Sequence, residues 1–209
     1  MSIGNYAKSV FINCPFDPQY DDIFDAIVFA VQHAGMRARC AKEYADGANN
    51  RLSNISTIIE ECKYGIHDIS RIETTIVNGV SLPRFNMPLE LGLFLGCKRF
   101  GDTRQQSKSC LILDSTPFRY RDFVSDIAGQ DIHTHNNDAH EAIRVVCRWL
   151  SAVDKRRDIP GGAITIRRYT KFRNQLPRFY NALHKEPGDV VYVDYVNAIT
   201  EWLRLNVLR

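Results

Sequence analysis

One acidic residue, Glu90, stands inside the apolar stretch FNMPLELGLFLGC, which runs from Phe85 to Cys97. At helical spacing, the leucines of this stretch leave hardly any polar face, so we expect the helix to be buried nearly all round. Pro88 suits a first helical turn, and Glu90 is expected in the same turn, near the positive end of the helix dipole. Carboxylates are seldom buried without a partner or a chemical role. Glu90 is therefore a candidate catalytic residue; the competing interpretation is a helix-start acid or half of a structural ion pair.

Polar residues also follow two predicted strands. The run SVFINC ends near Asn13 and leads into the loop PFDPQYD, and the run GIHDIS ends in Asp68 and Ser70. In open α/β sheets, ligands bind at the carboxyl ends of the strands. We therefore expect these three residues to gather beside Glu90 at one edge of a sheet. Structural interpretations compete here too, with Asp68 as a helix cap and Asn13 as a turn residue.

The elements that must position these residues alternate along the chain. Apolar runs predict strands at 9–14, 36–41, 65–70 and 109–115, with a short edge strand around Ile132. Amphipathic spacing predicts helices at 21–35, 51–62, 85–97 and 138–153. The connector 71–84 has no assigned structure. This alternation indicates an α/β domain over residues 1–152, with one parallel sheet of about four or five strands, the first strand central, and helices on its faces.

The chain changes character after about Val153. Residues 153–209 hold 11 Lys and Arg against 6 Asp and Glu, whereas the whole chain has a net charge of +3. The run DKRRDIPGGA is typical of a linker, and Pro177 is expected to interrupt the basic, aromatic-rich segment that follows. We expect 153–209 to form a basic C-terminal helical appendage that packs on the domain or on a second subunit. Within it, residues 164–208 should be mainly helical and should bury Phe172, Phe179, Trp202 and Leu205.

Composition narrows the class of protein. Hydrophobic residues make up 44% and charged residues 24% of the 209, as in an ordinary globular protein. The sequence has no run of 18 apolar residues, and MSIGNYAKSV lacks the apolar core of a secretory signal, so neither a membrane span nor export is expected. The six cysteines are scattered without a CxxC pair, which predicts reduced thiols, no metal site and a cytoplasmic protein. The histidines His67, His133 and His135 are expected to be structural or exposed.

Taken in order, these motifs resemble those of the TIR-like and nucleoside 2-deoxyribosyltransferase-like group. The resemblance rests on a strand ending FINCPFD, a strand ending HDIS and the stretch NMPLELGLFLGCKRF, and it spans roughly residues 8–150. Its most specific part is an acidic residue followed by Leu-Gly early in an apolar helix, here Glu90, Leu91 and Gly92. The resemblance implies a flavodoxin-like (TIR-like) parallel sheet and an enzyme that cleaves or transfers N-glycosidic bonds.

The resemblance also implies roles for single residues. The glutamate of the group is the catalytic carboxylate, which matches Glu90, and the aspartate at the end of the preceding strand often contacts the sugar, which matches Asp68. Asn86 fits the pattern found before the glutamate. The run FNMP stands where the transferases carry an Asp-x-Gly step, which favours a general N-glycosidase over a deoxyribosyltransferase. Bacterial TIR-like domains with such appendages often serve in antiphage defence, so the resemblance implies that role here. It also implies NAD or a nucleotide as substrate or ligand and no separate cofactor.

The chemistry fits these residue types. Breaking the bond between ribose C1′ and a base builds positive charge on the sugar, and a carboxylate can stabilise that charge or attack C1′. Phe11 and Phe16 are expected to stack on the base. Three arginines are alternatives for neutralising a phosphate, and the sequence does not choose among Arg51, Arg71 and Arg84. The predicted substrate-binding set is completed by Asn13, Asp68, Ser70 and Asn86.

Two other functions compete with an N-glycosidase acting on NAD or a nucleotide. One is a module without turnover that senses a nucleotide and signals through the appendage. The other, less favoured, is nucleic-acid binding by the basic and aromatic residues of 164–185. Against that stands a solvated helix face whose aromatic residues pack on the domain. A homo-oligomer is expected, and a membrane partner is not.

Overall fold

The computed structural model describes residues 3–44, 48, 50–72, 75–82, 84–155 and 158–207. Its main sheet is parallel throughout, in the order β2-β1-β3-β6-β7. The strands are β1 (Ser9–Asn13), β2 (Arg37–Arg39), β3 (Tyr64–Asp68), β6 (Ser109–Asp114) and β7 (Ile132–Thr134). The predicted α/β class is confirmed. The first strand is an inner strand, but β3 is the middle one, because both later strands add beyond β3 and only β2 adds beyond β1.

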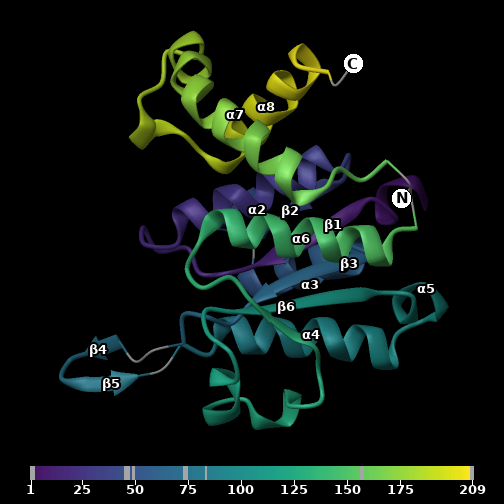
Figure 1. Ribbon diagram of the computed structural model, residues 1–209. Helices are drawn as coiled ribbons and strands as arrows, with labels where there is room; N and C mark the ends of the chain where they lie inside the picture. The colour runs from purple at the N-terminus through teal and green to yellow at the C-terminus, as the bar shows by residue number, and fades with distance from the viewer. Residues whose placement is uncertain are drawn as a thin grey trace.

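Helices cover both faces of this sheet (Figure 1). On one face lie α2 (Asp21–His33) and α6 (Ala139–Val153), and on the other lie α3 (Arg51–Glu61), α4 (Asn86–Phe100) and the short α5 (Thr103–Gln106). Side chains alternate between the two faces along β1: Val10 and Ile12 pack with α2 and α6, whereas Phe11 packs with α3 and α4. A strand covered on both faces is apolar throughout, which explains the continuous run at the start of the chain.

Shorter elements connect these layers. They are α1 (Ile3–Tyr6) and the 3-10 turns η1 (Ala41–Glu43), η2 (Arg119–Asp122), η3 (Ser125–Ile127) and η4 (Pro187–Asp189). The connector without an assigned structure contains an antiparallel hairpin of β4 (Thr75–Val77) and β5 (Val80–Leu82), which projects from the body (Figure 1). Its turn residues, Asn78 and Gly79, both have positive φ. Asn-Gly is the dipeptide that such tight hairpin turns favour.

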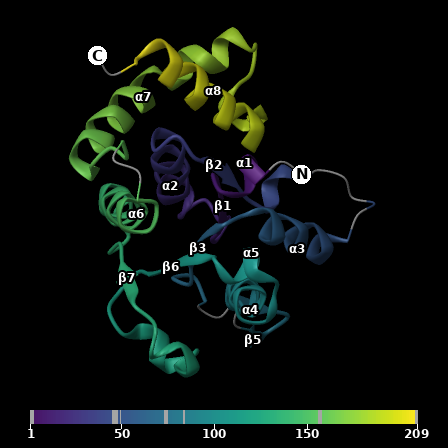
Figure 2. The same cartoon turned by 90° about the vertical axis from the view of Figure 1, so that its right-hand side faces the viewer.

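The C-terminal appendage forms a further layer over α2 (Figures 1 and 2). It consists of α7 (Gly162–Ala182) and α8 (Tyr192–Leu205). Phe29 of α2 stacks on Phe172 at a ring distance of 5.2 Å and lies 6.0 Å from Trp202, so these helices share a core with the α/β body. Both aromatic residues are buried as predicted, and Phe179 is partly buried.

Two expectations for the appendage were wrong. Leu205 is 61% exposed, although Trp202, one helical turn earlier in α8, is buried. Pro177 does not interrupt the segment, since α7 runs through it and leaves the proline on the exposed side of the helix. Leu208 lies outside the described residues. All six cysteines are free, and none of the described helices combines the length and apolarity that crossing a bilayer requires.

Candidate functional site

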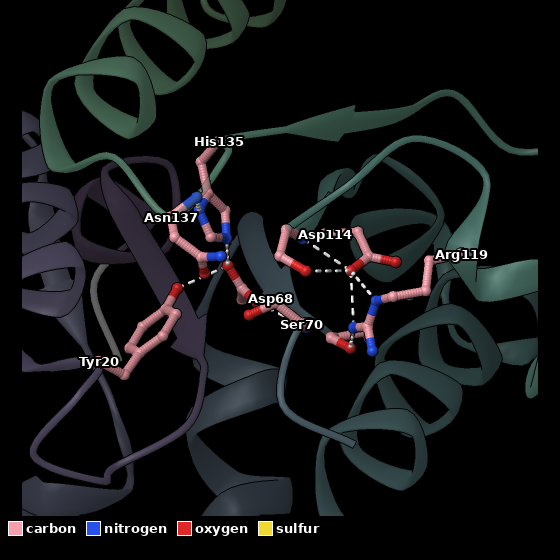
Figure 3. A network of polar contacts seen from close by, with 9 residues as sticks. Tyr20, Asp68, Ser70, Asp114, Arg119, His135 and Asn137 are labelled. Carbon is pink, nitrogen blue, oxygen red and sulfur yellow. Dashed lines mark hydrogen bonds and ion pairs between the residues drawn. The ribbon is translucent and has the colours of Figure 1, made fainter. Parts of the chain in front are cut away.

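The carboxyl ends of β1, β3, β6 and β7 meet at one edge of the sheet, because these strands are parallel neighbours. Two groups of polar side chains lie there, one around Asp68 and one around Asp114 (Figure 3). Each of these aspartates is the last residue of its strand, β3 or β6, and each is fully buried. Ser70, which follows β3, lies between the two groups (Figure 3). This edge therefore concentrates buried polar groups that a purely structural core would not need.

Asp68 is held by three segments of the chain. The Tyr20 hydroxyl donates a hydrogen bond of 2.5 Å to Oδ2, and Nε2 of His135 lies 2.9 Å from the same oxygen. The backbone N–H of Ser70 donates to Oδ1 at 2.8 Å. On the far side of the histidine, Nδ1 accepts a hydrogen bond from the N–H of Asn137, which assigns the ring proton to Nε2; this nitrogen is close to Asp68 but lacks hydrogen-bond geometry toward it. The carboxyl group is therefore fixed in place on both oxygens.

Asp114 is held on one oxygen only. Its Oδ1 accepts hydrogen bonds from the N–H of Ser115 at 2.6 Å and from Nε and Nη2 of Arg119 at 2.9 and 2.7 Å. Nη2 of the same arginine also donates to the carbonyl of Ile69. Burial raises the pKa of Asp114, while Arg119 and Ser115 lower it. Oδ2 is buried with no hydrogen-bond partner in the described part of the chain, and so is Oγ of Ser70. These two atoms are therefore buried polar groups of the edge whose hydrogen-bonding capacity is unused within the described chain.

Asn13 joins the end of β1 to its neighbours. Its Nδ2 lies 3.0 Å from Nδ1 of His67 on β3 and donates to the carbonyl of Met87 on α4 at 2.9 Å. His67 is fully buried, and burial lowers its pKa to about 3, with Lys108 acting in the same direction. A neutral His67 can accept from Asn13 through Nδ1. Asn13 therefore positions the first turns of α4 instead of standing at the rim of a pocket.

Glu90 is buried without a fixed partner. It is 8% exposed, and no hydrogen bond or ion pair ties it to another described residue. Burial raises the pKa of Glu90 from 4.5 to about 7, while the charge of Arg51 on α3 lowers it in part. Among the described residues, Glu90 forms no close ion pair, contrary to that alternative interpretation. Glu90 is a carboxyl group whose charged form is offset only in part, by the charge of Arg51.

The place of Glu90 within α4 differs from the predicted first turn, which contributes to this state of Glu90. α4 starts at Asn86, so Glu90 is its fifth residue and lies in the second turn. The stabilisation that a helix N-terminus gives to an anion falls off within the first turn. Glu90 therefore receives less support from the helix dipole than a first-turn acid would. Its own position in the helix leaves it dependent on charges from other elements.

The remaining predicted residues are distributed unevenly. Phe11 is fully buried among Ile55, Ile59 and Phe94, so its ring is not available to stack on a base, contrary to expectation. Phe16 is half-buried against Phe24, and its ring lies 4.7 Å from the ammonium of Lys42. Asn86 is exposed at the start of α4. Of the three alternative arginines, Arg51 is the one whose charge lowers the pKa of Glu90. Arg84 instead pairs with Asp17 at 2.9 Å.

Four residues of the edge were missed at the level of sequence: Tyr20, Asp114, Arg119 and His135. Asp114 had the same signal as Asp68, an acid at the end of the clearest apolar run, and a uniform reading of strand ends would have found it. His135 was grouped with structural or exposed histidines, whereas it is buried against Asp68. Its partner lies 67 positions away in the chain, so local sequence holds no sign of it.

Comparison with known proteins adds nothing to this geometry. No family model matches the chain, and no curated protein matches it either.

Proposed function

We propose that this protein is an N-glycosidase that cleaves or transfers the ribose–base bond of NAD or a nucleotide, with Glu90 as the catalytic carboxylate. The observation that carries the proposal is Glu90 itself, a buried carboxyl group without a hydrogen bond or ion pair to another described residue, whose pKa burial raises to about 7. Such a group is costly in a protein unless a ligand supplies what is missing. A sugar that becomes cationic in the transition state would supply it.

In the proposed reaction, the bond between C1′ and the base nitrogen breaks and its electron pair leaves with the base. Positive charge then builds on the ribose, and Glu90 stabilises it or attacks C1′ to form an ester. Water then adds at C1′ and gives up a proton, which releases ADP-ribose from NAD or a ribose phosphate from a nucleotide, or another nucleophile accepts the ribosyl group. Only the ionised form of Glu90 can do this, so the rate should rise with pH through about 7.

The other groups of the edge have supporting roles in this proposal. Asp68 is fixed by Tyr20 and His135, which suits a carboxyl group that must hold ribose hydroxyls in one orientation. Oγ of Ser70 and Oδ2 of Asp114 are buried without partners in the described chain and are suited to the same hydroxyls. NAD is favoured over a neutral nucleoside because its nicotinamide is already positively charged. That charge lowers the cost of ionising Glu90 and lets the base leave without a proton.

The test is release of free base by the purified protein, with NAD and then common nucleotides as substrates. Glu90→Gln keeps the size of the side chain and removes its charge, and turnover should fall by about 10²–10³-fold, as for other groups that stabilise a developing charge. Leu89→Gln, on the exposed side of the same helix, is the matched control and should retain turnover. Binding of NAD without any release would instead support the sensing module. Undiminished turnover in Glu90→Gln would remove Glu90 from the mechanism.

The resemblance to TIR-like proteins further supports proposing a bacterial defence role, a homo-oligomer and a cytoplasmic setting. These proposals are separate from the chemistry and do not depend on it.

A further inference from the structure

Arg71 lies at the same edge of the sheet and has a guanidinium group without a partner in the described part of the chain. It directly follows Ser70, whose backbone N–H donates to Oδ1 of Asp68 at 2.8 Å. The side chain of Arg71 is half-buried, and its Nε is buried with no hydrogen-bond acceptor among the described residues. Within these residues the guanidinium also forms no ion pair. A buried N–H group costs free energy unless something accepts its hydrogen bond, so Arg71 is a candidate to bind a ligand.

The charge of Arg71 acts on the group of side chains around Asp68. Burial raises the pKa of Tyr20 well above its usual value, the charge of Asp68 raises it further, and the charge of Arg71 lowers it in part. The hydroxyl on which these charges act donates to Oδ2 of Asp68 at 2.5 Å. Arg71 is therefore within electrostatic reach of the carboxyl group that the proposed function assigns to the ribose hydroxyls.

Contacts also join this part of the edge to Glu90. Leu91 follows Glu90 in α4 and packs in one apolar cluster with Ile69. Ile69, in turn, directly follows Asp68. The thiol of Cys14, just after β1, is affected by both acids: burial raises its pKa, and the charges of Asp68 and Glu90 raise it further. A ribosyl group between the two acids therefore lies close to the segment that carries the unpaired guanidinium.

The other two arginines that the sequence offered for a phosphate are placed differently. Arg84 already pairs with Asp17 at 2.9 Å. Arg51 is exposed on α3, where water hydrates its guanidinium and salt screens its charge. Of the three, Arg71 is the one that has a buried N–H without an acceptor in the described chain. A phosphate would supply the acceptor and the negative charge together, and its oxygens match the fork of guanidinium donors.

We infer that Arg71 binds the phosphate that the reacting ribosyl group carries at C5′, so that the protein acts on NAD or a nucleotide in preference to a free nucleoside. The inference rests on the proposed function and deepens it, because a nucleoside lacks this phosphate. The guanidinium holds the sugar at its 5′ end while Asp68 orients its hydroxyl groups. Arg71 is thus a specificity-determining residue, which contacts a part of the substrate that does not react.

The experiment uses ribose 5-phosphate and ribose as probes, each titrated into the full chain by calorimetry. The natural chain should bind the phosphate at least about tenfold more tightly than ribose, as a charge-assisted contact provides. Arg71→Met keeps most of the side chain and removes its charge, so this preference should disappear. Arg71→Lys keeps the charge without the fork and should retain part of the preference. Arg51→Met and Arg84→Met are the matched controls and should retain all of it.

The two Arg71 variants serve as checks on each other. If Arg71→Met fails to fold, Arg71→Lys still decides, because it should bind ribose as the natural chain does and ribose 5-phosphate more weakly. Absence of ribose 5-phosphate binding up to about 10 mM overturns the inference. A preference that Arg71→Met leaves intact, or that Arg51→Met or Arg84→Met abolishes, overturns it as well.

Activity separates this inference from the proposed function. Glu90→Gln should bind ribose 5-phosphate at least as tightly as the natural chain, because it removes a negative charge near the ligand. A phosphate preference that depends on Arg71, in a chain that releases no base, supports the phosphate site while the proposed glycosidase fails. Equally fast release of base from a nucleotide and from its nucleoside overturns the role of Arg71 while the glycosidase stands.

Discussion

Asp68 and Glu90 are both acids in the interior near one edge of the sheet, but their surroundings are opposite. Asp68 is 0% exposed, and Tyr20, His135 and Ser70 contact its two oxygens. Glu90 is 8% exposed, with no hydrogen bond to another described residue and a pKa that burial raises to about 7. The fold supplies hydrogen-bond donors to one carboxyl group and, within the described residues, none to the other. A carboxyl group that is largely buried without such donors is the one that asks for a function.

Matched carboxyl-to-amide substitutions test most directly whether Asp68 and Glu90 differ in their surroundings. Asp68→Asn puts an amide NH₂ where two sets of donors converge on two oxygens, so at least one donor in the interior loses its acceptor. The free energy of unfolding should fall by about 3–5 kcal/mol, as when one partner of a buried pair is removed. Chemical denaturation measures it. Equal losses for Asp68→Asn and Glu90→Gln at neutral pH would show that the two acids are not different in kind.

A smaller change isolates one contact of the satisfied acid. Tyr20→Phe removes the hydroxyl that donates to Asp68 at 2.5 Å and leaves the ring in place. The loss of stability should be about 2 kcal/mol, the usual size for a hydrogen bond to a carboxylate. Tyr44→Phe, at an exposed tyrosine, is the control and should change little. A loss within 0.5 kcal/mol, about the scatter of neutral surface changes, would mean that the Asp68 network is looser than its geometry indicates.

The unsatisfied acid should show itself in the dependence of stability on pH. Between the ordinary pKa of 4.5 and the folded value of about 7, the folded chain binds more protons at Glu90 than the unfolded chain does. Its contribution to stability therefore falls as pH rises through this window. At pH 8, Glu90→Gln should be more stable than the natural chain by about 3 kcal/mol, and this gain should vanish below about pH 4. Denaturation at a series of pH values checks both the sign and the window.

The smallest expected effect tests which charge acts on the pKa of Glu90. Arg51 is exposed and is the charge that lowers the pKa of Glu90. Arg51→Met should move the midpoint of the pH–rate profile upward by about a few tenths of a pH unit, and less in high salt, since exposed charges are screened. Arg84→Met, whose arginine pairs with Asp17, should leave the midpoint in place. A downward movement would show that Glu90 is controlled by some other charge.

The fold was largely predictable because its signals are local. Apolar runs marked the inner strands, and helical spacing marked the helices that cover them. The Asn78-Gly79 turn was also legible, since only residues tolerant of positive φ suit it, yet the connector around it was left without a structure. The prediction that Phe11 stacks on a base was wrong. A strand covered on both faces is apolar along its length, so its sequence does not show which residues face the site.

The candidate site was less predictable because its contacts join distant parts of the chain. Glu90 could be singled out from one helix, and Asp68 from the end of one strand. The partners that distinguish the two could not, since His135 reaches Asp68 only after β7 has joined the sheet beside β6. Sequence therefore indicated two of the acids that lie inside, Asp68 and Glu90, and only the tertiary structure showed Asp114 and which of these acids have hydrogen-bond donors beside them.

The position of α8 has a consequence for how the protein is made. Phe29 packs on Trp202, and both lie in the largest core. A ribosome adds about 5–20 residues per second, so on the order of ten seconds or more separates synthesis of the two rings. During that interval the aromatic face of α2 is not covered by α8. We expect the polypeptide to be a better chaperone client before α8 has been synthesised than afterwards, because the aromatic face of α2 lacks that cover until then.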